Sequence, residues 1–236
     1  ESPHYEEVLF YAEWSPDGSQ IVGTTWEEGN VEIYDAITLE KLSSFTVEKG
    51  PLVQARWSPD GKRIATTGLS GEAAIRDAST GEVLLQLFPD NFSEQTMGIT
   101  WTRDGEEVII SGLGIGYRFD ASTGEELMQY IGFNDISALI ILSPDEQLVY
   151  FMVSDGTARV YEVATGVELL VYELGGWVNG SLSPDGTRLL LTSTLGEIGI
   201  YPTWSTVEEL TTYAKECCVK YELSPEEREQ FGLPSN

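Results

Sequence analysis

The pentapeptide Trp57-Ser58-Pro59-Asp60-Gly61 decides the fold of this chain, because it is one of five closely related copies. The other copies read Trp14-Ser-Pro-Asp-Gly18, Trp101-Thr-Arg-Asp-Gly105, Leu142-Ser-Pro-Asp-Glu146 and Leu182-Ser-Pro-Asp-Gly186. The aspartates of successive copies are 43, 44, 41 and 40 residues apart. A steady period of this length indicates a repeat protein in which every period folds into one supersecondary unit.

A second phrase keeps the same period and begins 16 to 18 residues after the aspartate of each pentapeptide. Its copies start at Asp35, Asp77, Asp120 and Glu162, and two of them read Asp-Ala-Ser-Thr-Gly-Glu. Both phrases have the composition of tight turns, since Pro presets φ, Asp hydrogen-bonds to nearby backbone and Gly accepts a positive φ. Short runs rich in Val, Ile, Leu and Tyr lie between the turns and predict β-strands.

The second repeat shows the arrangement, with strands A to D predicted at residues 52–57, 63–67, 73–77 and 82–88. Four short antiparallel strands in each period are typical of a β-propeller blade. A β-sandwich with regular turns does not account for two different turn phrases at one shared period. The predicted fold class is therefore an all-β propeller with five recognisable four-stranded blades. Their predicted bounds are 8–46, 52–88, 97–131, 137–173 and 177–202.

With these two phrases, the chain resembles bacterial WD-repeat proteins over roughly residues 8–202. The residue pair that names that family is replaced here by Tyr34-Asp35, Arg76-Asp77, Phe119-Asp120, Tyr161-Glu162 and Tyr201-Pro202. The Gly-His pair of the family is absent as well, so the buried His–Asp network that the resemblance implies cannot form. We expect these blades to rely on apolar packing instead.

The two ends of the repeat array leave three arrangements open. The fifth repeat is expected to lack its own strand D, because Pro202-Thr203-Trp204-Ser205 stands where the turn before that strand would be. Residues 1–7 could supply a short closing strand, as the resemblance implies, or the chain could be the C-terminal part of a longer propeller. A neighbouring molecule could also supply the missing strand, because unpaired strand edges invite such addition.

After Trp204 the spacing of apolar residues changes to a helical one, which predicts a helical tail at residues 205–236 behind a propeller at 1–204. Thr206-Val207-Glu208-Glu209 has the pattern of a capping box, and a second helix start follows at Ser224-Pro225. The tail is similar to those that follow WD repeats in many bacterial multidomain proteins. Its adjacent Cys217 and Cys218 are expected to be buried as small hydrophobic residues or to form a vicinal disulfide.

The formal net charge is −26, from 39 acidic and 13 basic residues. This excess argues against binding to nucleic acid or to an anionic membrane, because phosphate groups would be repelled. It suits a basic partner or divalent cations, and it also serves solubility alone. No targeting segment is visible, and no run approaches the roughly 20 apolar residues of a membrane span.

No catalytic, metal-binding or cofactor-binding motif stands out. The single histidine, His4, precedes the first repeat, and the sequence has no His-Glu-x-x-His, Cys-x-x-Cys or phosphate-binding Gly-rich loop. Gly112-Leu113-Gly114-Ile115-Gly116 is followed by a predicted strand, so it indicates a strand connection. The repeated aspartates stand alone beside Gly and indicate turns, because a calcium loop gathers several oxygen ligands. We therefore predict no enzyme activity and no cofactor.

The A–B and C–D turns fall on one face of a propeller, and the B–C and D–A loops, which differ between repeats, share the other. Binding usually takes place on such variable loops. The candidate partner-binding residues on this loop-rich face are Trp26, Glu27, Glu28, Asp90, Phe92, Phe133, Asp135 and Trp177. Aromatic residues among acids suit a protein or peptide with basic and apolar groups, although Phe133 and Trp177 could instead pack between blades.

The aromatic residues that end strand A have a different prediction. Trp14, Trp57 and Trp101 occupy one register, so they are expected in the core or between blades. The functional prediction is a non-catalytic protein-interaction or sensing module, part of a longer chain. The alternative is a structural subunit that assembles by strand exchange at incomplete blade edges, and a propeller enzyme ranks third.

Overall fold

The computed structural model describes residues 9–25, 29–47, 51–88, 95–204 and 207–217. In these ranges the chain forms strands β1 to β17 followed by helix α1 (Val207–Cys217). The first sheet contains β1 (Leu9–Trp14), β2 (Gln20–Thr25), β3 (Asn30–Asp35) and β4 (Lys41–Thr46). The second sheet contains β5 (Leu52–Trp57), β6 (Arg63–Gly68), β7 (Ala73–Asp77) and β8 (Val83–Gln86). These strands agree with those predicted for the second repeat.

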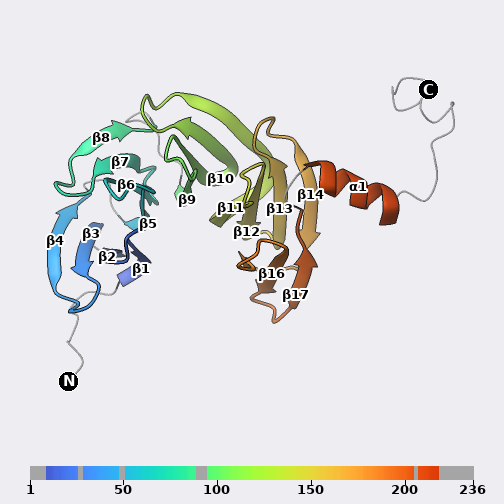
Figure 1. Cartoon of the computed structure of the whole chain (residues 1–236), viewed down its shortest axis with the longest axis horizontal. Coiled ribbons are helices and arrows are strands. Elements are labelled where there is room, and N and C mark those ends of the chain that lie inside the picture. Colours follow the sequence, from blue (N-terminus) through green and yellow to red (C-terminus); the bar gives the residue numbers. More distant parts are fainter. Residues whose placement is uncertain (1–8, 26–28, 48–50, 89–94, 205–206, 218–236) are drawn as a thin grey trace.

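The remaining strands form one sheet of six and one of three. The six-stranded sheet contains β9 (Thr96–Trp101), β10 (Glu107–Asp120), β11 (Glu126–Leu142), β12 (Leu148–Val153), β13 (Thr157–Glu162) and β14 (Glu168–Glu173). The three-stranded sheet contains β15 (Val178–Leu182), β16 (Arg188–Ser193) and β17 (Ile198–Pro202). The sheets follow one another around an arc, with β1–β4 at one end and β15–β17 at the other (Figure 1). The architecture is all-β and propeller-like.

The five repeats thus fall on four sheets, where five separate blades were predicted. The difference arises because β10 continues through the expected B–C loop of the third repeat, and β11 continues from the third repeat into the fourth. The N-terminal half of β10 pairs with β9 and its C-terminal half pairs with β11. The C-terminal half of β11 pairs with β12. Because the two halves of each long strand pair with different neighbours, the third and fourth repeats still have four strand segments each, like the first and second. The fifth keeps three among the described residues, as predicted.

The five A–B turns have one common geometry. In each, a Ser or Thr hydroxyl donates to the Asp carboxylate two residues later, for example from Ser15 to Asp17 at 2.6 Å and from Ser183 to Asp185 at 2.5 Å. The next residue has a positive φ and is Gly in four copies, whereas Glu146 takes this position at φ 59° in the fourth. Hydrogen bonds from the Ser15 hydroxyl, and then from Ser19, lower the pKa of Asp17 to about 2. These aspartates are therefore turn residues, as the sequence indicates.

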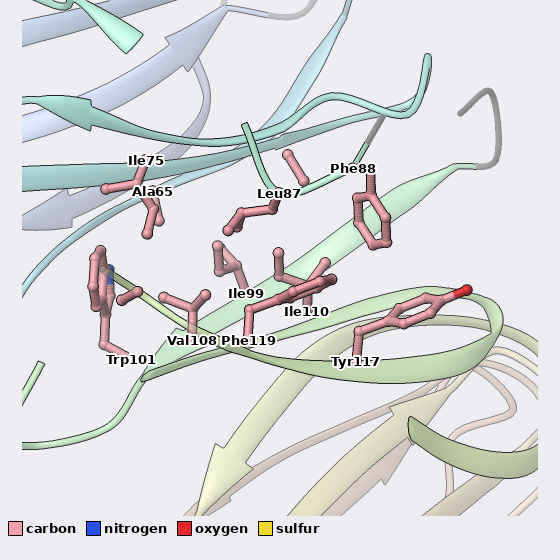
Figure 2. Packing of buried hydrophobic residues seen from close by; sticks show 12 residues of the cluster. Ala65, Ile75, Leu87, Phe88, Ile99, Trp101, Val108, Ile110, Tyr117 and Phe119 are labelled. Atoms are coloured by element: carbon pink, nitrogen blue, oxygen red, sulfur yellow. The ribbon is translucent and has the colours of Figure 1, made fainter. Parts of the chain in front are cut away.

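Apolar packing between neighbouring repeats forms the core. Between the second and third repeats, Ala65, Ile75, Leu87 and Phe88 face a set of side chains from β9 and β10 (Figure 2). That set is Ile99, Trp101, Val108, Ile110, Tyr117 and Phe119. Each internal junction has its own cluster of this kind.

The prediction that Trp14, Trp57 and Trp101 share one environment holds for two of them. Trp57 and Trp101 are buried between repeats, with exposed fractions of 7% and 8%. Trp14 is 60% exposed, so its expected burial is wrong for the described structure. The physical reason is position: Trp14 faces the side of the first sheet on which a preceding repeat would pack, and the described residues provide none there.

Polar pairs, one of them buried at both partners, supplement the apolar packing, which the sequence prediction did not foresee. Arg76 directly precedes the aspartate that opens the C–D turn of the second repeat, and its Nη2 donates to Glu72 Oε1 at 2.8 Å. Both side chains are buried. At the same position in the fourth repeat, the Tyr161 hydroxyl lies 3.0 Å from Glu168 Oε2, and burial, followed by this hydrogen bond, raises the pKa of Tyr161. The packing of the second and fourth repeats thus includes polar contacts as well as apolar side chains.

Helix α1 packs on the end of the repeat array. Leu210 is buried, and the Tyr213 ring lies 5.0 Å from the Trp204 ring. The Tyr150 hydroxyl lies 3.4 Å from the Trp204 carbonyl oxygen. The predicted first helix is therefore confirmed, while its cap at Thr206, the second helix and Cys218 lie outside the described residues. Within the described ranges, α1 falls short of the length and apolarity that a membrane-crossing helix requires.

We expect Gly81→Ala to destabilise the protein by about 1–3 kcal/mol more than Gly18→Ala does. Both glycines have φ near 70°, at 75° and 72°, so both substitutions carry the same backbone strain. A Cβ at Gly81 would also lie 2.4 Å from Phe45 Cγ, whereas a Cβ at Gly18 meets nothing within 4 Å. Urea denaturation of the two variants measures the difference. Equal losses of stability would show that Phe45 moves aside without penalty.

Candidate functional site

A groove opens on the loop-rich face, at the ends of strands from the second, fourth and fifth repeats. Its volume is about 520 Å³. The lining residues are Gln54, Ala138, Leu139, Trp177, Val178, Asn179, Thr192, Ser193 and Thr194. We call it the Trp177 groove, because Trp177 contributes the largest exposed side chain, with 53% of its surface accessible.

A Gly-rich connection places Trp177 at the rim. Gly175 and Gly176, just before it, have φ values of 75° and 67°, which non-glycine residues rarely adopt. The Trp177 backbone N–H then donates to Thr194 Oγ1 at 3.0 Å, and the Thr194 N–H donates to the Trp177 carbonyl at 3.0 Å. These paired hydrogen bonds hold the backbone of Trp177 while its ring stays accessible.

Gln54 forms the floor of the groove by joining three repeats. Its Nε2 donates to the Ala138 carbonyl at 2.9 Å, and its Oε1 accepts from the Ile99 N–H at 3.1 Å. The Gln54 side chain is buried, and both ends of its amide have partners. The signal in the sequence is a single amide within the strand Leu-Val-Gln-Ala-Arg-Trp, which our sequence reasoning passed over.

The chemistry of the Trp177 groove is neutral and mixed. Its lining residues offer an indole ring, aliphatic side chains, hydroxyls and amides. The neighbouring loop adds Leu195, which is 73% exposed, and the exposed Glu197. Among the residues that the structure describes, no cluster of three or more His, Cys, Asp or Glu side chains offers a metal site. Such a surface can hold an apolar side chain of a ligand while hydrogen-bonding to its backbone.

The structure brings one of the eight predicted partner-binding residues to this groove. Trp26, Glu27, Glu28, Asp90 and Phe92 lie outside the described residues. Phe133 is 4% exposed, and its ring stacks on that of Phe151 with centroids 5.4 Å apart, so this side chain belongs to the core. Asp135 is half-buried, and its Oδ1 accepts from the Ile136 N–H at 2.8 Å. Of the three predicted residues that the structure describes, Trp177 alone combines exposure with a hollow beside it.

A larger hollow of about 670 Å³ lies among the A–B turns, on the opposite face from the Trp177 groove. Its rim includes Pro59, Arg103, Pro144 and Glu146. The Arg103 guanidinium donates to the Pro144 carbonyl at 2.7 Å, and the Arg103 N–H donates to the Glu146 carboxylate at 2.6 Å. These polar groups already join neighbouring turns, so the Trp177 groove is the better candidate for binding a partner.

Comparison with known proteins supports the fold. No protein-family model matches the chain, and no curated protein matches it. Among solved structures, the chain is similar to one in the crystal structure of a mitotic checkpoint complex, with a TM-score of 0.74 and 18% sequence identity. The match covers 84% of this chain and 62% of that one. At this level of identity the likeness shows a shared fold alone.

Proposed function

We propose that this chain is a non-catalytic protein-interaction or sensing module of the WD-repeat type, which binds a protein or peptide through its loop-rich face. The single observation that carries the proposal is Trp177, which is 53% exposed beside a groove of about 520 Å³. Tryptophan is among the residues that most often dominate binding energy, especially where it borders a pocket. The similar chain belongs to a multi-protein complex, which is consistent with this role.

The charge of the chain indicates which partners suit this face. The net charge of −26 would attract a basic segment and raise its rate of association at low salt. Two exposed acidic residues, Glu173 and Glu197, lie close in the sequence to residues that line the Trp177 groove. The groove itself is lined by neutral groups. We therefore propose a peptide whose apolar side chain enters the groove, with Lys or Arg beside it.

We expect Trp177→Ala to weaken peptide binding about 30-fold, which corresponds to roughly 2 kcal/mol for an anchoring tryptophan. The probe is a synthetic library of peptides that carry one Lys or Arg next to a Leu or Ile, with binding measured by fluorescence anisotropy. Trp14→Ala is the matched control, because Trp14 is similarly exposed but ends β1 on the side of the A–B turns. A library without binders, or equal affinities for both variants, would contradict the proposal.

A second candidate function, assembly by strand exchange, rests on the edge of the last sheet. Among the described residues the sheet β15–β16–β17 ends at β17, whereas the first and second sheets each have a fourth strand. An extended segment could add to this edge. If residues 1–7 of a neighbouring molecule do so, deleting them abolishes any concentration-dependent polymer.

A further inference from the structure

Each junction between repeats is built from two different faces, as the second and third repeats show in Figure 2. The later repeat contributes Trp101 and Val108, which lie three residues before and four residues after its turn aspartate. The earlier repeat contributes Ala65 from its second strand, together with Ala73 and Ile75 from its third. Packing these two halves together leaves Trp101 only 8% exposed.

The first repeat carries the Trp half of such a junction with nothing described against it. Trp14 and Ile21 lie three residues before and four residues after Asp17, in the same positions as Trp101 and Val108. They are register partners on β1 and β2. Trp14 is 60% exposed, against 8% for its counterpart. We call Trp14 and Ile21 the head face.

The fifth repeat carries the other half. Leu190 follows Asp185 by five residues, as Ala65 follows Asp60, and Ile198 and Ile200 take the positions of Ala73 and Ile75. Ile198 and Ile200 are 72% and 67% exposed, and Ile200 is the register partner of Leu190. We call Leu190, Ile198 and Ile200 the tail face. The head and tail faces lie on the two end sheets of the arc in Figure 1.

An arginine makes the match more specific. Arg63 lies over the Trp101 ring at 4.8 Å, and its guanidinium donates to the Gly105 carbonyl at 2.7 Å across the junction. Arg188 occupies the position of Arg63, three residues after its turn aspartate, and it is exposed beside the tail face. Trp14 and Gly18 stand in the first repeat where Trp101 and Gly105 stand in the third. The chain thus carries both halves of a Trp–Arg junction of the kind that joins its second and third repeats.

We propose that the head face of one copy of this chain packs against the tail face of a second copy, reproducing an internal junction between molecules. Because the two faces differ, the contact is head-to-tail. Contacts of this type produce closed rings when the rotation closes and open filaments when it does not. The net charge of −26 opposes association, so salt, which screens that repulsion, strengthens it.

Sedimentation velocity at increasing protein and NaCl concentrations tests this contact. We expect the unchanged chain to form species heavier than 26.0 kDa. A head variant, Trp14→Ser, and a tail variant, Ile198→Ser with Ile200→Ser, should each remain monomeric alone. Mixed together they should form a 1:1 dimer and nothing larger, because one intact head then meets one intact tail. Arg188→Gln should weaken association about two- to fivefold.

Several results would overturn the proposal. These are an unchanged chain that stays monomeric, a mixture that does not recover the dimer, and a head variant that associates alone. The last result would indicate strand exchange or a symmetric contact. A monomeric native protein whose polypeptide exceeds 26.0 kDa would point to cover by other parts of the same polypeptide. If an apolar variant loses its fold, Arg188→Glu tests the same contact at an exposed position, and it must weaken association more than Arg188→Gln does.

Discussion

Trp57→Ala is expected to lower the free energy of unfolding by about 3–5 kcal/mol, the range typical of removing a buried tryptophan from a core. Trp57 is 7% exposed and packs with Val22, Ile33 and Ile64 between the first two repeats. Its loss leaves a cavity that rigid strands on both sides cannot fill. Urea denaturation followed by circular dichroism measures the change.

Trp14→Ala is the matched control for this prediction. Trp14 has the same place in its repeat, but it is 60% exposed, so in dilute solution its removal should reduce stability by less than about 1 kcal/mol. A comparable loss in both variants would show that Trp14 is covered in the folded monomer. That outcome would also remove the exposed tryptophan on which the head face depends.

Glu72→Ala is expected to cost about 3–5 kcal/mol, because it leaves the charge of Arg76 buried without its partner. The two side chains are 3% and 8% exposed, with Nη2 and Oε1 2.8 Å apart. Arg76 also donates to the Gly81 carbonyl and lies over the Phe45 ring at 5.8 Å. The substitution therefore disturbs both the second sheet and its junction with the first.

The double variant Glu72→Leu with Arg76→Leu removes both charges of the pair. Comparing it with Glu72→Ala separates the stability lost with the ion pair from the cost of leaving the Arg76 charge buried without a carboxylate partner. Replacing both members of a buried ion pair with apolar residues is often neutral or stabilising. We expect the double variant to be more stable than Glu72→Ala in the same urea titration. A double variant that is less stable would instead assign the stability to the ion pair itself.

The repeat turns made most of the fold predictable from the sequence. Their chemistry is local, since the Asp60 carboxylate accepts from Ser58 and Lys62 within its own turn, and Gly61 takes the positive φ. Strand bounds in the second repeat followed from these fixed points. The four sheets could not be predicted in the same way, because β10 and β11 continue through segments that carry ordinary loop residues.

The candidate site was less predictable because exposure depends on neighbours that are distant in the sequence. Phe133 and Trp177 have similar local surroundings of Gly and polar residues, yet Phe133 packs on Phe151 and Trp177 stays accessible. Trp14 is the opposite case, since its register predicts burial and yet its side chain is 60% exposed. Gln54 gave no local sign of its partners, which lie 45 and 84 residues away.

The hydrogen bonds of Gln54 have a consequence for how the molecule opens. Repeat arrays in which each unit contacts only its neighbours can unfold from the ends, unit by unit. Gln54 connects the second repeat directly to the fourth through the Ala138 carbonyl, while also holding the Ile99 amide of the third. We therefore expect these three repeats to separate together more readily than singly, whereas the first and fifth repeats can detach on their own. Amide hydrogens should exchange most slowly at the centre of the arc and fastest at its two ends.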